Sequence, residues 1–332
     1  MRTVRRALLL LLLAAAAAPV AARAADPPPL PSRAQLLADR ANFLQLAEQG
    51  LKKTKQLWWN EKLGWYDDRL NDIDRLPLAT LWSAYPLFEA TNAVAIAHPT
   101  AANKAAVNFF ARKAEKYWDP NIKPFGGFSY YYTARGGWNA YFDDNGWWGL
   151  AFLDAYRATG NKRWLWNAGR ALKVIDGVGW DKKSGGVWWD TDHHHKTSEP
   201  LAAGALIAAM LYRYEPRPYY LKTAKKYIAW ADKRTWVKKV GLYGRNPTDT
   251  TVMDYVEGMF IAAHAELCEA TKVRSYCTKA KALANARDEQ GLWSKRWDGD
   301  WTKPGMLRTQ AGTLALLGWI AAAKPPSVLT WK

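Results

Sequence analysis

Long hydrophobic runs are scarce in this sequence. The apolar run at residues 8–18 is too short to span a bilayer comfortably, and no other stretch is both long enough and free enough of charge. Strand patterns are confined to short pieces such as residues 185–189, and no serine or cysteine nucleophile motif and no nucleic-acid-binding motif is visible. These absences argue against a membrane-spanning chain, a β-sheet fold and a nucleic acid as partner.

Cysteine is equally scarce. Among 332 residues only Cys268 and Cys277 are cysteines. They flank residues 269–276, the expected turn of a helical hairpin, and in an oxidising compartment they can pair and clip that turn. Two unpaired small hydrophobic residues are the alternative, which is less usual in an exported protein.

The first 25 residues are typical of a secretory signal peptide. A basic start is followed by apolar residues 8–18 and by a small-x-small cleavage signature at residues 22–24. We therefore expect residues 1–25 to be removed and the protein to be secreted or periplasmic, without stable membrane insertion; an uncleaved anchor is the alternative. Residues 26–34 predict a stiff proline-rich spacer, and residues 35–325 predict one domain.

Charge and tryptophan content are both unusual. The net charge is +17, and removal of the four arginines in residues 1–25 leaves +13. Because the lysines are scattered, the pattern indicates a solvated basic exterior with a weak attraction to anionic polymers. The chain holds 20 tryptophans, many beside Gly, Asp or Asn. Loop aromatics suit flat sugar faces, whereas about half are expected to be packing anchors.

Helical periodicity dominates the chain after the spacer. Ten helices are predicted, and their apolar faces provide a large core. They are 33–58, 78–97, 101–117, the helix that follows Asp144, 163–177, the run 205–212, 218–233, the run 259–263, 275–287 and the run 313–317.

A repeat of 54 or 55 residues organises the second half. Gly149, Gly204, Gly258 and Gly312 each open an apolar helix, and the first three are followed by a short turn and a lysine-rich amphipathic helix. Repeated hairpins of this length stack into a solenoid or close into a ring. The pattern predicts an inner ring of buried helices and an outer, solvated ring.

A longer loop precedes each inner helix. The loops are residues 119–142, 179–197, 235–250 and 289–306. In a ring they lie at the same end, where their polar and aromatic residues converge on one face.

Two adjacent acids stand at the start of one inner helix. Asp143 and Asp144 lie between aromatic residues, near the positive end of the expected helix dipole. Paired carboxylates beside stacking surfaces are what glycoside cleavage needs, one to protonate the leaving oxygen and one to attack the anomeric carbon. The alternative is that they only cap the helix; convergence of the loops favours catalysis.

These residues resemble a known family. Residues 141–151 resemble the signature of glycoside hydrolase family 76, the endo-α-1,6-mannanases. Residues 185–189 with Lys196, and residues 205–212, are also similar, and a weaker likeness extends over residues 35–323.

The resemblance implies an all-α fold, an (α/α)6 toroid, and hydrolysis of α-1,6-mannosidic bonds with retention and without a cofactor. It makes Asp143 the nucleophile and Asp144 the acid/base. A full toroid has twelve helices, so one hairpin is expected to be reduced. Residues 255–258 read Tyr-Val-Glu-Gly where the family commonly carries Tyr-Asn-Gln-Gly.

Several other residues are candidates for substrate contact. They are Trp82, Trp138, Asn145, Trp188, Trp189, Lys196, Tyr255, Glu257 and Gln310. Glu257 and Gln310 are equally explained as helix-start residues. The run of histidines at residues 193–195 suggests a metal, but consecutive histidines cannot all face one ion, so no metal site is expected.

The sequence therefore predicts a monomeric, secreted glycoside hydrolase that cleaves or transfers α-1,6-linked mannose polymers. One alternative keeps the toroid but takes another, anionic glycan. A second alternative is a glycan-binding module without turnover, although both acids of the pair are present.

Overall fold

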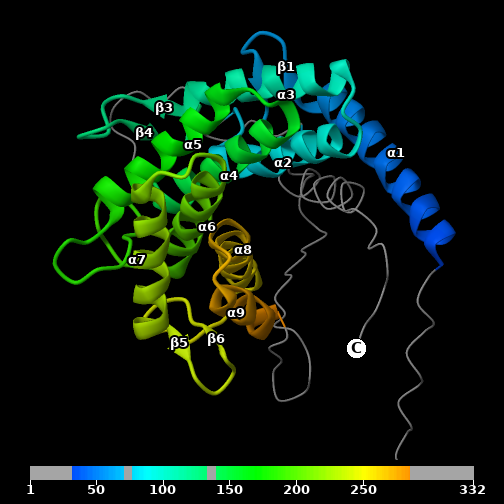
Figure 1. The fold of residues 1–332 in the computed structure, drawn as a ribbon. Helices are drawn as coiled ribbons and strands as arrows, with labels where there is room; N and C mark the ends of the chain where they lie inside the picture. Colours follow the sequence, from blue (N-terminus) through cyan, green and yellow to red (C-terminus); the bar gives the residue numbers. More distant parts are fainter. Residues whose placement is uncertain (1–31, 71–76, 133–139, 285–332) are drawn as a thin grey trace, which may run out of the picture.

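The helices follow an arc of two rows (Figure 1). The computed structural model describes residues 32–70, 77–132 and 140–284, and the predicted signal peptide lies outside them. The inner helices are α2 (Leu81–Ala97), α4 (Phe142–Thr159), α6 (Ser198–Tyr214) and α8 (Asp254–Thr271). The outer helices are α1 (Arg33–Trp58), α3 (Ala101–Ala114), α5 (Lys162–Val174), α7 (Pro218–Arg234) and α9 (Arg274–Ala284).

The distribution of apolar residues around each helix determines whether it lies in the inner or the outer row. The inner helices α2, α4 and α6 are apolar on nearly every face and are buried along most of their length. Each inner helix contacts the next, α2 with α4, α4 with α6, and α6 with α8. The outer helices bury one stripe only, so the predicted inner and outer rows are confirmed for the described residues.

Two predicted helices end in a turn that is tighter or wider than an α-helical turn. The helix predicted over 101–117 ends as α3 at Ala114 and continues as a 3-10 turn (Glu115–Tyr117). The helix predicted over 163–177 ends as α5 at Val174 and widens into a π-turn (Ile175–Gly179). The helix predicted after Gly312 lies outside the described residues.

The glycines of the repeat do not open the inner helices, contrary to the prediction. The helices α4, α6 and α8 begin at Phe142, Ser198 and Asp254, several residues before each glycine and 56 residues apart in both steps. Close packing explains two of these glycines. A Cβ added at Gly149 would lie 2.6 Å from Ile207 Cδ1, and one added at Gly204 would lie 2.5 Å from the Tyr227 ring.

A small hairpin follows each of the outer helices α1, α3, α5 and α7. Three are two-residue antiparallel ladders, β1 (Trp59–Asn60) with β2 (Trp65–Tyr66), β3 (Trp118–Asp119) with β4 (Gly127–Phe128), and β5 (Trp236–Val237) with β6 (Leu242–Tyr243). In the fourth, Trp180 and Val187 form a single bridge. The strand expected at residues 185–189 is therefore reduced to isolated bridges.

Each hairpin begins with a tryptophan, and a cation from the next outer helix lies over its ring. The pairs are Lys113 over Trp59 at 5.6 Å, Arg170 over Trp118 at 3.4 Å, Lys226 over Trp180 at 4.3 Å, and Lys279 over Trp236 at 3.5 Å from the ring centroids. A cation–π contact contributes about 0.5–2 kcal/mol, depending on how far it is desolvated. The outer row is thus joined, unit to unit, by contacts between side chains of fixed repeat positions.

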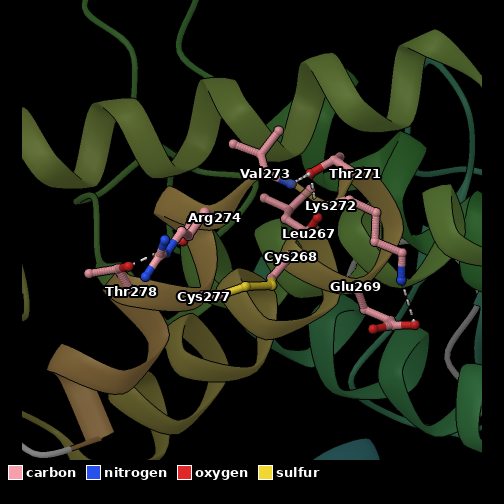
Figure 2. The surroundings of a disulfide bond; sticks show 9 residues. All are labelled: Leu267, Cys268, Glu269, Thr271, Lys272, Val273, Arg274, Cys277 and Thr278. Atoms are coloured by element: carbon pink, nitrogen blue, oxygen red, sulfur yellow. Dashed lines mark hydrogen bonds and ion pairs between the residues drawn. A yellow bond between two sulfur atoms is a disulfide. The ribbon is translucent and has the colours of Figure 1, made fainter.

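The disulfide joins the last described hairpin (Figure 2). Cys268 lies in the last turn of α8 and Cys277 near the start of α9, with their Cα atoms 5.2 Å apart. Between them the chain turns at Lys272, which has a left-handed φ of 58°. The bond closes the turn at residues 269–276 that the sequence analysis identified.

Loops before the inner helices lie at one end of the arc because the inner helices bind them. The first amide of α2, at Leu81, donates to Tyr130 O (2.8 Å); that of α4, at Phe142, donates to Trp189 O (2.8 Å); and that of α6, at Ser198, donates to Arg245 O (2.7 Å). The common end is confirmed for the first three predicted loops; residues 289–306 lie outside the described residues.

We expect Gly204→Ala to destabilise the fold. Alanine favours a helix over glycine by about 1 kcal/mol, but here its Cβ would meet the buried Tyr227 ring, whose hydroxyl is bonded to Asp176 and which therefore cannot retreat. Overpacking of this kind costs about 1–3 kcal/mol. Chemical unfolding should show the loss.

The matched control is Gly169→Ala, inside α5, where the new Cβ would make an ordinary contact at 3.5 Å from the Tyr220 hydroxyl. It should stabilise the protein slightly. Equal gains in stability for both variants would contradict the packing argument.

Candidate active site

Asp143 and Asp144 lie in the first turn of α4, but neither caps it. The N-cap residue is Tyr141, which makes no side-chain capping bond, so the cap-only alternative does not describe them. The helices α6 and α8 also begin without a side-chain cap and carry acids in their first turns. Three positively polarised helix N-termini whose N-cap residues make no side-chain bond therefore meet the loops at the same end of the arc.

Asp143 is the partly exposed member of the pair. Its Oδ1 accepts the Asp144 amide (3.0 Å), and the Trp189 indole donates to its carboxylate. Burial raises the pKa of Asp143 to about 6, with a smaller upward contribution from the charge of Glu199, while the two donors oppose the shift. The donors stabilise the ionised form, so Asp143 is suited to be the carboxylate of the pair.

Asp144 is the buried member, with 6% of its surface exposed. Burial, and then the adjacent charge of Asp143, raise its pKa well above the usual value. Two carboxyl groups with pKa values pushed apart are the arrangement that assigns one as acid and the other as base.

Asn145 fixes the start of α4 and does not face a substrate. Its side chain is fully buried; Nδ2 donates to Phe128 O and Tyr141 O, and Oδ1 accepts the Phe128 amide, all at 2.9 Å. The prediction that Asn145 contacts substrate is therefore wrong, because its amide is fully used by the backbone of the preceding hairpin.

Glu257 has the same task in α8. Its Oε1 accepts the Tyr243 amide (2.7 Å) and only 6% of the residue is exposed, so it too binds the backbone of the preceding hairpin rather than facing outward. Asn145 and Glu257 are both the fourth residue of their helices. Burial raises the pKa of Glu257 to about 7. One carboxylate oxygen of Glu257 is thus a structural tie, and its contact with substrate stays a prediction.

An aromatic wall stands beside the acids. Trp147 packs against Trp82 (ring centroids 5.5 Å apart), Tyr85 (5.1 Å) and Tyr255 (5.7 Å). Tyr255 is 41% exposed. Its pKa is raised by burial and then by the charges of Glu199 and Asp143, which places it within electrostatic reach of the pair. The structure thus brings Trp82 and Tyr255 to the same tryptophan, Trp147.

Of the predicted tryptophan pair, only Trp189 reaches the acids. It bonds to Asp143 and packs on Tyr141, with ring centroids 4.9 Å apart. Successive side chains of an extended strand point to opposite sides, and Trp188 accordingly packs away from Trp189, on His193 (5.1 Å) and under Lys196 Nζ (4.7 Å).

Lys196 is held within its own loop. Its ammonium group forms an ion pair with Asp181 (2.6 Å) and a hydrogen bond with Ser184. The structure therefore brings Trp188 and Lys196 to each other and not to the acids, and their contact with substrate stays a prediction.

Trp138 and Gln310 lie outside the described residues. The histidine run serves its loop: His194 Nδ1 bonds to Asp190 (2.7 Å), which raises the pKa of His194. Nowhere in the described part do His, Cys, Asp or Glu residues gather in a group that could hold a metal ion.

No helix among residues 32–70, 77–132 and 140–284 has the length and hydrophobicity to cross a membrane.

Glu199 is the site residue that the sequence analysis missed. It is the second residue of α6, as Asp143 is of α4, and 4% of it is exposed. Its Oε1 accepts Arg245 Nε at 3.3 Å, while its buried Oε2 has no partner in the described residues. The signal was the 56-residue step from Asp143 through Glu199 to Tyr255, whereas the glycine repeat was one or two residues shorter.

The chain is similar to known proteins in sequence and in fold. The family model of glycosyl hydrolase family 76 matches residues 108–297. Among curated proteins, none matches the chain significantly.

Solved structures share the fold at low sequence identity. A family 76 α-mannanase from Bacteroides thetaiotaomicron superposes with a TM-score of 0.74 at 17% identity, over 86% of this chain and 98% of its own. An inactive variant of an α-1,6-mannanase from Salegentibacter sp. HEL1_6, with two adjacent aspartates replaced by alanine, is in complex with α-1,6-mannotetrose; its TM-score is 0.66 at 14% identity, over 85% and 99% of the chains.

A D-mannose isomerase has a TM-score of 0.59 at 16% identity, over 85% of both chains. With the family match, these likenesses confirm the predicted (α/α)6 toroid fold.

We expect Asp144→Asn to raise the stability of the folded protein at neutral pH. A carboxyl group whose folded-state pKa is raised destabilises the fold once the pH exceeds its unfolded value, and the penalty grows as the pH rises toward the folded value. The amide has nearly the same shape without that penalty, so thermal unfolding at pH 7 should shift upward by a few degrees, as removal of a strained functional group often does.

The gain should shrink as the pH falls and disappear below about pH 3, where the aspartate is protonated in both states. Asp254→Asn, which changes an exposed first-turn aspartate of α8, is the control and should give no such gain. A loss of stability for Asp144→Asn would show that its role is structural.

Proposed function

The chain belongs to glycosyl hydrolase family 76, and from that premise we propose that it hydrolyses α-1,6-linked mannose polymers with retention of configuration. The observation that carries the proposal is the acid pair at the open end of α4, with the pKa of Asp143 raised to about 6 and that of Asp144 raised further. The Salegentibacter mannanase, inactive when two adjacent aspartates are replaced, supports the same pair here.

In the proposed reaction Asp143 attacks the anomeric carbon while Asp144 gives its proton to the leaving glycosidic oxygen. The carboxylate and proton donor of retaining enzymes lie roughly 5 Å apart, a separation that neighbours in one helical turn can reach. The resulting mannosyl ester on Asp143 is then hydrolysed by a water molecule whose proton passes to Asp144. Each group thereby returns to its starting protonation state.

Surrounding groups support both steps. The Trp189 indole and the Asp144 amide stabilise the Asp143 carboxylate before attack and after release. Trp82 and Tyr255 provide aromatic surface on which sugar rings stack. The unpartnered Oε2 of Glu199 offers an acceptor for a sugar hydroxyl, which makes Glu199 a proposed substrate-contact residue.

We also propose that the protein works outside the cytoplasm, with residues 1–25 as its signal peptide, residues 26–34 as spacer and residues 35–325 as one toroid domain. The Cys268–Cys277 disulfide supports an oxidising compartment. The helix α1 begins at Arg33, slightly before the predicted domain start.

The first test is release of mannose oligomers from α-1,6-mannan. Wild-type protein should release them with the α-anomer formed first, as followed by NMR. Asp143→Asn and Asp144→Asn should each lower kcat by about 10²–10⁴-fold, because each removes a nucleophile or a proton donor, while the fold remains intact in thermal unfolding. Intact mannan, or conversion of free D-mannose to fructose instead, would refute the proposal.

The pH profile provides a second test. Activity needs Asp143 ionised and Asp144 protonated, so kcat/KM should rise with pH through an apparent pKa of about 6 and fall at a higher pH. Glu199→Gln removes a negative charge that raises the pKa of Asp143, so the acidic limb should move to lower pH.

Glu269→Gln removes an equal charge from the exposed last turn of α8 and should leave the profile unchanged. If Glu199→Gln lowers kcat/KM without moving the acidic limb, Glu199 does not act on Asp143 through its charge.

A further inference from the structure

Arg170, on the outer face of α5, has an unusual environment. Its guanidinium carbon lies 3.4 Å from the Trp118 ring centroid and 4.3 Å from that of Trp166. The guanidinium is therefore held between two indoles, and Trp166 is 60% exposed. Rings bind the faces of a guanidinium but leave the N–H groups at its edge to other partners.

No carboxylate of the described residues forms an ion pair with Arg170. Its Nη1 donates to Asn167 Oδ1 (3.1 Å). The nearby Glu115 instead binds Arg163 through two hydrogen bonds of 2.7 and 2.8 Å. Burial lowers the pKa of Arg170 to about 10, with the charge of Arg163 adding to the effect and that of Glu115 opposing it. Arg170 remains a cation at neutral pH, partly desolvated and with no ion pair among the described residues, which suits an anion receptor.

Two grooves meet at this arginine. One, of about 800 Å³, runs between α5 and the start of α7, and the other, of about 660 Å³, runs toward α3. Trp118, Trp166 and Arg170 line both grooves. Asp143 and Asp144 line neither groove.

Cations exceed acids in the larger groove. Lys162 and Lys173 line it beside Arg170. Its acids are neutralised by neighbours, since Asp176 is bound by Lys226 and Glu215 by Arg217 (3.1 Å). The groove therefore presents exposed aromatic surface beside uncompensated positive charge.

We propose that this outer groove is a second binding site for an anionic glycan. A sugar ring stacks on the exposed face of Trp166, and a phosphate or carboxylate group of the chain binds the edge of Arg170 with help from Lys173. The glycan part of this inference rests on the proposed function, whereas the anion part rests on Arg170 and the charge of the groove. Such a site would hold a polymer on the outside of the toroid while a separate segment occupies the acid pair.

The test is a binding measurement that does not need turnover. Calorimetry with the Asp143→Asn variant would use four probes: a phosphate-bearing mannan, the same mannan after dephosphorylation, an uncharged α-1,6-mannan oligomer and a uronic-acid polymer. We expect Trp166→Ala, added to that background, to weaken binding of the charged glycans by about tenfold. Arg170→Gln should remove the preference for the phosphate-bearing mannan over its dephosphorylated form, and the uronic-acid arm shows whether a carboxylate is accepted as well.

Lys52→Gln, on exposed α1, removes the same charge as Arg170→Gln and is the control. Because Trp166 is largely exposed, Trp166→Ala keeps the test valid even if Arg170→Gln does not fold. Unchanged binding in Trp166→Ala, or an equal loss in Lys52→Gln, would overturn the site. Binding of anionic vesicles or oligonucleotides, but of no glycan, would overturn the glycan assignment. Cleavage of the short uncharged oligomer by wild type, and by Trp166→Ala equally, tests the proposed function separately.

Discussion

The first amide of each inner helix determines how this protein is built. A helix leaves its first N–H groups unsatisfied, and in α2, α4 and α6 the first of these donates to a carbonyl of the loop that precedes the next inner helix. One backbone bond thereby satisfies the helix start and sets the position of the following loop. Repeated along the arc, it brings the loops to the same end without any side chain being prescribed.

Because that bond uses only the backbone of the first residue, the residues that follow it differ from one inner helix to the next. The second residue is Asp143 in α4, Glu199 in α6 and Tyr255 in α8, and all three lie within electrostatic reach of one another. The fourth residue binds the preceding hairpin in α4 and α8, through Asn145 and Glu257. The acid pair thus lies between these two structural ties, and Asp143 Oδ1 also accepts the Asp144 amide at the start of its own helix.

Much of the fold follows from sequence patterns, and the site follows only in part. Apolar periodicity placed the helices because burial of a whole face leaves a strong signal. Side-chain direction leaves almost none. Glu257 and Trp188 are residue types that are common in sugar-binding sites. Glu257, however, is turned inward by its bond to the Tyr243 amide. Trp188 lies on the opposite side of its strand from Trp189. Glu199 was missed because its role depends on the exact start of α6, and the glycines pointed to packing instead.

The repeated contacts of the outer row differ from unit to unit. Lys226 and Lys279, which cover Trp180 and Trp236, also meet the carboxylates of Asp176 and Asp232. In α5 the cation is an arginine, which forms no ion pair among the described residues, and a second tryptophan of the same helix, Trp166, also lies over its guanidinium. A purely structural contact would need only one ring and would be more stable with its charge compensated. The exposed indole and the uncompensated guanidinium together are what packing alone does not explain.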